Sequence, residues 1–334
     1  MAGVAESSLE RTAAALRASE ERLRTVVGRA PIVLWAVDRR GIFTLSDGAG
    51  LHALGLEPGQ AVGQSVFEMY ADFPEVIDHV RRAMAGEELR ATVDVGNAIF
   101  ESHFTPLRDG GGRVTGVIGV STDVTERATA ERALRRAREE TIHRLARAVE
   151  VRSAETGGHI DRMGRFCELI ARRLGMAEEE IDLIRVASPM HDVGKLAVPD
   201  SVLLKPGPLN PAERAVMQTH AEVGRELLAG SGEELPELAA TITWTHHERF
   251  DGSGYPRGLE RDQIPLEGRI AAVGDVFDAL THDRIYRAAM PVEEAVELMR
   301  RASGAHFDPD VLDCFLDAMD DVLEISRRHA PAPA

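Results

Sequence analysis

The sequence predicts a multidomain protein in which a small α+β domain precedes a helical linker and an all-α domain. Two observations predict this order: β-rich runs separated by turn residues fill the first 125 residues, and helical periodicity fills the remainder. A length of 334 residues is sufficient for two separate hydrophobic cores. We expect an N-terminal helix over 1–20, the α+β domain over 21–125, the linker over 126–145 and the all-α domain over 146–334.

The composition narrows the class of protein and its partners. Hydrophobic residues make up 44% of the chain and charged residues 28%, which is typical of a globular protein. The net charge of −16 argues against a nucleic-acid polymer as partner, because no basic excess would release counterions. No apolar run approaches the roughly 18 residues of a membrane span, and no export signal precedes the first domain. Cys167 and Cys314 lack metal-type or redox-type spacing, so we expect a cytoplasmic protein without a membrane partner.

The first 125 residues contain two predicted hairpins. An amphipathic helix over 5–27 is followed by "IVLWAVD" and "IFTLSD", two β-rich runs that "RRG" separates. A helix is predicted over 74–87, and then "AIFESHFTPL" and "VTGVIGVSTDV" flank the turn sequence "RDGGG". Antiparallel strands with flanking helices therefore form the predicted α+β domain.

The helical signal begins near residue 125. An apolar stripe at approximate coiled-coil spacing runs through this Arg- and Glu-rich segment and comprises Ala130, Leu134, Ala137, Thr141, Leu145 and Ala148. The stripe fits a dimeric coiled coil, and it fits equally well a single helix that packs the stripe on the next domain. Further helices follow, one of them starting at Asn210 and Pro211 as N-cap and first helical residue.

Histidines and acids recur at helical spacing in the second half. Glu155 and His159 are four residues apart, and Lys195 lies one turn after the His191–Asp192 pair. Further candidates on predicted helices are His220, the pair His246 and His247, and the acids Asp275 and Asp278. Imidazoles with carboxylates suit Zn, Fe, Mn or Ni, and the absence of thiolates argues against a structural zinc site. An Asp can bridge two metals, because each of its oxygens can face a different ion.

The use of lysine in this chain is unusual. Only two of the 39 basic residues are lysines, Lys195 and Lys205, and all others are arginines. A sequence that prefers Arg elsewhere keeps Lys where a compact ammonium cannot be replaced by a planar guanidinium. Lys195, next to the His191–Asp192 pair, is therefore a candidate catalytic residue.

Taken together, residues 140–325 resemble the HD-GYP family, metal-dependent phosphohydrolases that cleave cyclic di-GMP. The segments that carry the resemblance, in family order, are "ETGGHIDRM", "HDVGKLAVPD", "LLKPGPLNPAE", "THAEVG", "HHERFDGSGYP" and "GDVFDALTHDRIYR". The resemblance implies that Asp192 bridges two metals and that the other metal ligands are His159, His191, His220, His246, His247 and Asp275. It also implies that Glu155 recruits a third metal and that Lys195 contacts the scissile phosphate.

The same resemblance implies roles for residues near the substrate. Arg284 and Arg287 hold the dinucleotide, and Tyr255 in the Gly254–Pro256 loop that names the family borders the bound substrate. This loop is also an expected surface for protein partners, such as GGDEF-domain proteins.

The first half resembles a PAS sensor domain over about 20–125. The segment "DRRGIFTLSDGAGLHALGL" is similar to the opening hairpin and helix of that fold, and "FTPLRDGGGRVTGVIGVSTDVTER" is similar to its last two strands. "DVTER" is the usual exit into a signalling helix. The sequence predicts no particular ligand for this sensor domain.

Together these features predict metal-dependent hydrolysis of cyclic di-GMP to linear pGpG or GMP, under control of the PAS domain. Two or three divalent ions, Fe or Mn, are the expected cofactors, and a homodimer through the helices that flank the PAS domain is expected. One alternative is a phosphohydrolase for a hybrid cyclic dinucleotide or another nucleotide. The other is a non-catalytic module that binds a cyclic dinucleotide or a protein partner. The complete set of candidate ligands, with Lys195, favours catalysis.

Overall fold

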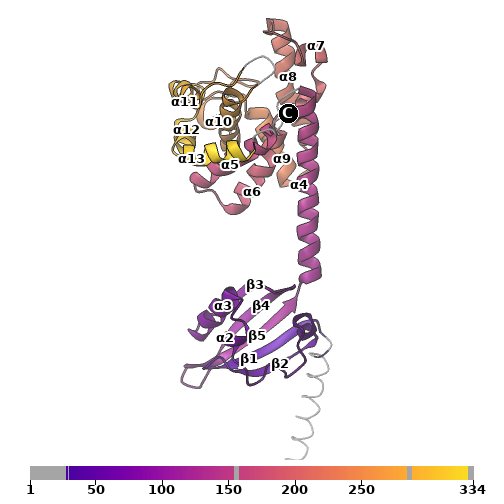
Figure 1. The fold of residues 1–334 in the computed structure, drawn as a ribbon, viewed down its shortest axis with the longest axis vertical. Coiled ribbons are helices and arrows are strands. Elements are labelled where there is room, and N and C mark those ends of the chain that lie inside the picture. The colour runs from indigo at the N-terminus through magenta and orange to yellow at the C-terminus, as the bar shows by residue number, and fades with distance from the viewer. Residues whose placement is uncertain (1–27, 29, 154–157, 284–287, 330–334) are drawn as a thin grey trace, which may run out of the picture. The chain divides into compact units, whose positions relative to one another are not determined.

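The computed structural model describes residues 28, 30–153, 158–283 and 288–329. The chain divides into two compact units, residues 1–134 and 135–334. A five-stranded antiparallel sheet with flanking helices forms the first unit, and helices form the second (Figure 1). The predicted fold class, an α+β domain followed by an all-α domain, is confirmed. Within the described part of the chain, no helix has the length and apolar character that crossing a bilayer requires.

The sheet of the first unit has the strand order β2-β1-β5-β4-β3, and every neighbouring pair is antiparallel. Its strands are β1 (Ile32–Asp38), β2 (Phe43–Asp47), β3 (Leu89–Val95), β4 (Ala98–Arg108) and β5 (Val114–Asp123). The helical segments beside it are η1 (Ala49–Leu54), α2 (Val66–Met69) and α3 (Pro74–Met84). Both predicted hairpins and the predicted helix at 74 are confirmed.

One face of this sheet carries the core of the unit. Val33, Trp35 and Val37 alternate along β1 and are buried, as expected for a strand with one face inward. The Trp35 ring meets Phe104 edge to face at 5.4 Å, and its indole nitrogen donates to Ser121 Oγ at 3.1 Å. Gly119 is the cross-strand partner of Trp35, and a Cβ there would lie 2.2 Å from the indole ring. A glycine is therefore required opposite the tryptophan, and a cavity of about 60 Å³ remains in this core.

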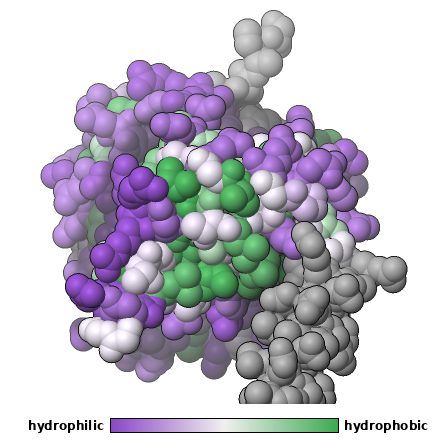
Figure 2. Space-filling model, turned by 90° about the horizontal axis from the view of Figure 1, so that it is seen from below, coloured by the Kyte–Doolittle hydropathy of each residue, from purple (hydrophilic) through white to green (hydrophobic). Residues whose placement is uncertain are grey.

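The opposite face of the sheet is apolar where β1 and β5 pair. Ile32 and Leu34 alternate with the inward residues of β1, and Leu34 pairs with Val120 of β5, which is 38% exposed. Figure 2 shows a patch of apolar side chains that hydrophilic side chains surround. Such a patch is typical of a surface that another protein segment covers.

Helix α4 (Thr125–Ser153) follows β5 directly. Its predicted apolar stripe lies on the exposed side of the helix: Leu134 is 72% and Leu145 is 54% exposed. The residues that pack in the core of the second unit are instead Ala146 and Val149, with Ile142 beside them. Of the two alternatives, packing of the stripe on the next domain is therefore wrong, because a different face of the helix makes that contact.

The second unit is built from helices around one hydrophobic core. Its elements are α5 (His159–Arg173), α6 (Glu178–Ala187), η2 (Ser188–Met190), η3 (Val193–Ala197), α7 (Asp200–Leu203), α8 (Pro211–Leu228), α9 (Glu234–Thr245), η4 (Arg261–Gln263), α10 (Leu266–Thr281), α11 (Val292–Arg301), α12 (Pro309–Leu316) and α13 (Met319–Arg328). Phe166, Phe277 and Phe315 meet edge to face at centroid distances of 5.0–5.7 Å, and they join α5, α10 and α12.

Local sequence signals set the start of α8 and its contact with η3. Asn210 Oδ1 accepts from the Glu213 amide at 2.9 Å, and Glu213 Oε2 accepts from the Asn210 amide at 2.8 Å. The predicted cap is confirmed. Farther along α8, the main chain of Gly194 approaches so closely that a Cβ there would lie 1.9 Å from the His220 carbonyl oxygen. Glycine at position 194 thus lets η3 lie directly on the helix that carries His220.

Candidate metal centre

The predicted metal ligands within the described residues come from five separate segments of the second unit. His159 is the first residue of α5, and the His191–Asp192 pair lies between η2 and η3. His220 lies on α8, His246 and His247 follow the end of α9, and Asp275 lies on α10. The fold therefore brings residues from distant parts of the sequence to one region of the second unit.

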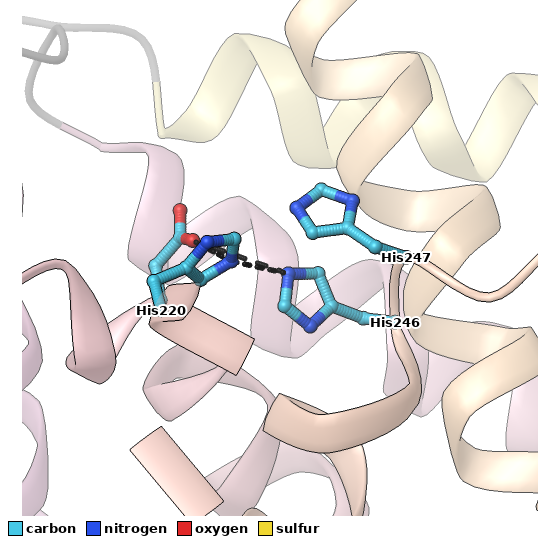
Figure 3. Close-up of side chains that lie close together, drawn as sticks. His220, His246 and His247 are labelled. Atoms are coloured by element: carbon cyan, nitrogen blue, oxygen red, sulfur yellow. Dashed lines mark hydrogen bonds and ion pairs between the residues drawn. The ribbon is translucent and has the colours of Figure 1, made fainter. Parts of the chain in front are cut away.

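Two groups of donor atoms form here, and Asp192 belongs to both. Ligand atoms within 4.8 Å of one another are offered by His159, His191 and Asp192 in one group and by Asp192, His220, His246 and His247 in the other. Asp192 Oδ2 lies 3.2 Å from His191 Nε2, whereas Oδ1 lies 3.4 Å from His220 Nε2 and 3.9 Å from His246 Nε2. Each carboxylate oxygen thus faces a different group, which is the geometry that a bridge between two metal ions requires. Figure 3 shows His220, His246 and His247 side by side at the second group.

The imidazole rings are oriented for ligation through Nε2. His191 Nδ1 lies 2.9 Å from the Ser188 carbonyl oxygen, His220 Nδ1 2.8 Å from that of Met217, and His246 Nδ1 2.9 Å from that of Thr243. A carbonyl oxygen only accepts, so Nδ1 carries the proton and the Nε2 lone pair points into the cluster. This tautomer is the one that a metal ligand needs.

The charges of the cluster also suit a cation. Burial alone would raise the pKa of Asp192, but Lys195 and His191 hold it well below its usual range. Burial lowers the pKa of His246 to about 3 and that of His247 well below its usual value, and the neighbouring histidines add to the effect. His220, His246 and His247 are therefore neutral beside an ionised carboxylate, a donor set that fits a divalent metal. His191 differs: burial opposes its charge, but the Asp192 and Asp275 carboxylates raise its pKa to about 9, so a metal ion bound at Nε2 would displace a proton.

Lys195 lies beside the bridging carboxylate. Its Nζ is 2.6 Å from Asp192 Oδ2, and its side chain is 13% exposed. The other lysine, Lys205, lies outside the cluster, where its ammonium meets Glu213 Oε2 at 2.5 Å next to the cap of α8. Of the two lysines, Lys195 is thus the one that lies beside the carboxylate shared by both donor groups.

Asp278 contacts a candidate ligand in a way that the sequence did not reveal. Its Oδ2 accepts from His159 Nδ1 at 2.7 Å, and Arg162 donates to both of its oxygens at 2.5 and 3.0 Å. Asp278 and Arg162 are buried, so the carboxylate is held as an ion pair and in turn fixes the tautomer of His159. The three-residue spacing from Asp275 on one helix was visible, but the partner His159 is 119 residues away.

Asp278→Asn should weaken metal binding by about 10- to 100-fold while the protein stays folded, because an outer acceptor that orients a ligand is lost. Metal content after dialysis against graded chelator concentrations measures the change. Asp313→Asn, which removes the same charge from an exposed position on α12, serves as the control. Equal metal retention in both variants would rule out this orienting role.

The loop after His247 closes over the second donor group. The Tyr255 ring stacks on His247 at a centroid distance of 4.7 Å, and burial raises the pKa of its hydroxyl. Buried Glu248 anchors the loop, because its carboxylate accepts from the amides of Arg257 and Leu259 at 2.8 and 3.0 Å. Tyr255 thus borders the candidate site.

Some of the predicted site residues do not lie in either donor group or fall outside the described residues. Asp275 belongs to neither donor group, and its Oδ1 lies 4.0 Å from His191 Nε2. Glu155, Arg284 and Arg287 lie outside the described residues, so their expected roles stay predictions.

Comparison with protein families matches both units. A model described as an HD domain matches residues 140–311, about half of the chain, and a model described as a PAS fold matches residues 27–129.

Three phosphodiesterases are similar to this chain in sequence. The chain is 46% identical over 192 residues to 3'3'-cGAMP-specific phosphodiesterase 2 of Vibrio cholerae, covering 58% of this chain and 37% of that protein. It is 45% identical over 195 residues to the cyclic di-GMP phosphodiesterase response regulator RpfG of Xanthomonas campestris, covering 58% and 52%. It is 41% identical over 190 residues to a cyclic di-GMP phosphodiesterase of Thermotoga maritima, covering 57% and 52%.

The chain spans about half or less of the length of these relatives. The matched region includes the two donor groups, the lysine and the loop after His247. The chain therefore belongs to the HD domain family, in its HD-GYP type, with a PAS fold ahead of the helical unit.

Proposed function

We propose that this protein hydrolyses the phosphodiester bonds of cyclic di-GMP to linear pGpG or GMP, in a reaction that depends on divalent metals. The observation that carries the proposal is the pair of donor groups that share Asp192, with the Lys195 ammonium 2.6 Å from the shared carboxylate. Relatives named as phosphodiesterases of cyclic di-GMP and of 3'3'-cGAMP support the same class of substrate.

The chain would hold a pair of ions through the residues of the two groups. When bound, two divalent cations stabilise the attacking and leaving oxygens of a phosphoryl displacement and lower the pKa of a coordinated water. Asp192 would contribute one oxygen to each ion, and Asp275 would complete the ligand set beside His191. We assign Glu155 to a third ion.

The side chains around the donor groups bind and orient the substrate. The Lys195 ammonium neutralises one oxygen of the scissile phosphate, and this local positive charge offsets the net charge of −16 on the chain. The Tyr255 ring, stacked on His247, borders the bound dinucleotide. In this proposal Arg284 and Arg287 hold the dinucleotide.

We infer iron or manganese as the resident metal. Mixed imidazole and carboxylate donors suit both metals, and a thiolate donor would have favoured zinc. Burial raises the pKa of Cys167 to about 12, and this thiol belongs to neither donor group.

Purification without oxygen, followed by metal analysis and turnover assays, tests the proposal. Cyclic di-GMP and 3'3'-cGAMP are offered separately, and products are separated by chromatography. We expect two or three ions per chain, cleavage of cyclic di-GMP, loss of turnover with a chelator and recovery when the metal returns. Cleavage of 3'3'-cGAMP alone would assign the hybrid substrate. Tight binding without cleavage by the metal-loaded protein would assign a non-catalytic module.

We also propose a homodimer in which two copies of α4 pair along the exposed stripe, so that the PAS region controls the site through this helix. Leu134 and Leu145 are large apolar residues that a second copy would cover. Light scattering at micromolar concentration should give twice the chain mass, and Leu134→Glu with Leu145→Glu should give the monomer. A monomeric unmodified chain would contradict this assembly.

The loop that contains Tyr255 is the surface at which we propose protein partners such as GGDEF-domain proteins. The guanidinium carbons of Arg257 and Arg225 lie 4.3 and 3.9 Å from the centroid of the Trp244 ring. Two cations therefore contact one indole beside the loop. Binding of such a domain that survives Arg257→Glu would contradict this assignment.

We place the protein in the cytoplasm, where its two free cysteines would stay reduced, and cell fractionation tests this location.

A further inference from the structure

Arg152, in the last turn of α4, donates four hydrogen bonds to one short stretch of chain. Nη1 donates to the carbonyl oxygens of Lys195 and Leu196 at 2.7 and 2.8 Å. Nη2 donates to the carbonyl oxygen of Val198 at 2.7 Å and to Asp200 Oδ1 at 2.9 Å. Three of the four acceptors are main-chain carbonyls at the C-terminal end of η3, where the last carbonyls of a helix need partners from outside it.

η3 is also fixed by α8. A Cβ on Gly194 would lie 1.9 Å from the His220 carbonyl oxygen and 2.6 Å from the Gly224 amide nitrogen. The turn is therefore held by two supports, the main chain of α8 and the Arg152 guanidinium. Both supports contact η3 through its main chain.

The position of the Lys195 ammonium depends on this turn. The Lys195 amide donates to the Asp192 carbonyl oxygen at 2.9 Å, and the Val198 amide donates to the Lys195 carbonyl oxygen at 3.1 Å. The side chain that leaves this backbone reaches Asp192 Oδ2. A shift of the backbone at 195–198 would therefore move the ammonium relative to the bridging carboxylate.

The three hydrogen bonds to carbonyl oxygens stabilise this contact more than the ion pair with Asp200 does. Asp200 is 69% exposed, so water and salt screen its attraction to Arg152. A planar guanidinium can donate to several carbonyls at once, whereas the ammonium of a lysine is a single point and a glutamine has one amide group. Arginine is thus the residue type that this contact requires.

We propose that Arg152 is a positioning residue that holds the turn of Lys195, and with it the ammonium, at the place where the scissile phosphate binds. This inference rests on the proposed function. Because α4 begins in the first unit and ends at this contact, Arg152 also ties the helix that leaves the five-stranded sheet to the site.

The full-length variants Arg152→Gln and Arg152→Lys test the inference, with Arg147→Gln as an exposed control on the same helix. Arg152→Gln should lower kcat by about 10- to 100-fold, the scale expected when a reacting group is displaced by about an ångström. KM and metal content should change by less than about twofold. Arg152→Lys should recover part of the rate, and Arg147→Gln should match the unmodified chain. If Arg152→Gln fails to fold, Arg152→Lys carries the comparison.

Hydrogen exchange and a double-variant cycle separate positioning from a general loss of stability. The amides of Lys195 and Val198 should exchange faster in Arg152→Gln, while amides in the core of α5 should not. In a Lys195→Met background, Arg152→Gln should cost less than about a further twofold, because its effect passes through the lysine. Fully additive losses, or unchanged exchange at these amides, would overturn the inference. The exchange measurement needs no substrate, so it decides the role of Arg152 even if the proposed function fails.

Discussion

Asp192→Asn is expected to lose both bound metal and turnover, with a fall in rate on the order of a thousandfold or more. The carboxylate offers Oδ2 to one donor group and Oδ1 to the other, and the amide of asparagine keeps only one oxygen. Its NH₂ group cannot ligate, and the negative charge that offsets two cations is lost. Both ions should therefore bind more weakly, although the side chain keeps its shape. Metal analysis and the cyclic di-GMP assay on the same preparation measure the two effects together.

Circular dichroism and the exposed control Asp313→Asn show whether a loss in the Asp192 variant is specific. The control removes one negative charge from α12 and should retain full metal content and rate. Full activity of Asp192→Asn would mean that no bridge passes through this residue, and the ligand assignment would have to change.

Sequence periodicity was sufficient for the order of the two units but not for every element. β3 was not predicted, although its residues alternate between inward and exposed positions, because the run is short, only Val93 in it is fully buried, and its outward positions at the sheet edge carry charged residues such as Arg90 and Asp94. The stripe of α4 was visible in sequence, yet the face that packs is set by Ala146 and Val149, which tertiary contacts select. Local pattern predicts a helix and its apolar positions, whereas the core decides which of them it covers.

In the candidate site, too, some residues could be recognised from the sequence and others could not. Histidines and acids at helical spacing were recognisable as possible ligands because imidazole and carboxylate chemistry is evident from residue type. The groups that orient them were not recognisable, since the Ser188 and Met217 carbonyls carry no side-chain signal. The Asp278 contact joins residues 119 positions apart, and the Arg152 contact joins a helix end to a turn more than 40 residues later. Such contacts arise only from the packed fold.

Lys195→Arg is expected to fold and keep its metal but to lose most of its rate, by about 10- to 100-fold. The ammonium is compact and lies 2.6 Å from Asp192 Oδ2 in a setting that is 13% exposed. A guanidinium is longer and planar, and close packing of Gly194 on α8 prevents the turn from moving back to make room. The charge is therefore kept but displaced from the phosphate oxygen. The rate constant kcat measures the loss, and metal content measures whether the donor groups stay intact.

Lys205→Arg is the matched control, because it makes the same exchange at the other lysine of the chain. Lys205 pairs with Glu213 at the start of α8, and a guanidinium can make that ion pair equally well. This variant should retain the rate of the unmodified chain. If Lys195→Arg also retained it, the compact ammonium would be dispensable and the retention of lysine at position 195 would have no catalytic cause. A loss confined to Lys195→Arg would instead show that the geometry of the cation, and not its charge alone, sets the rate.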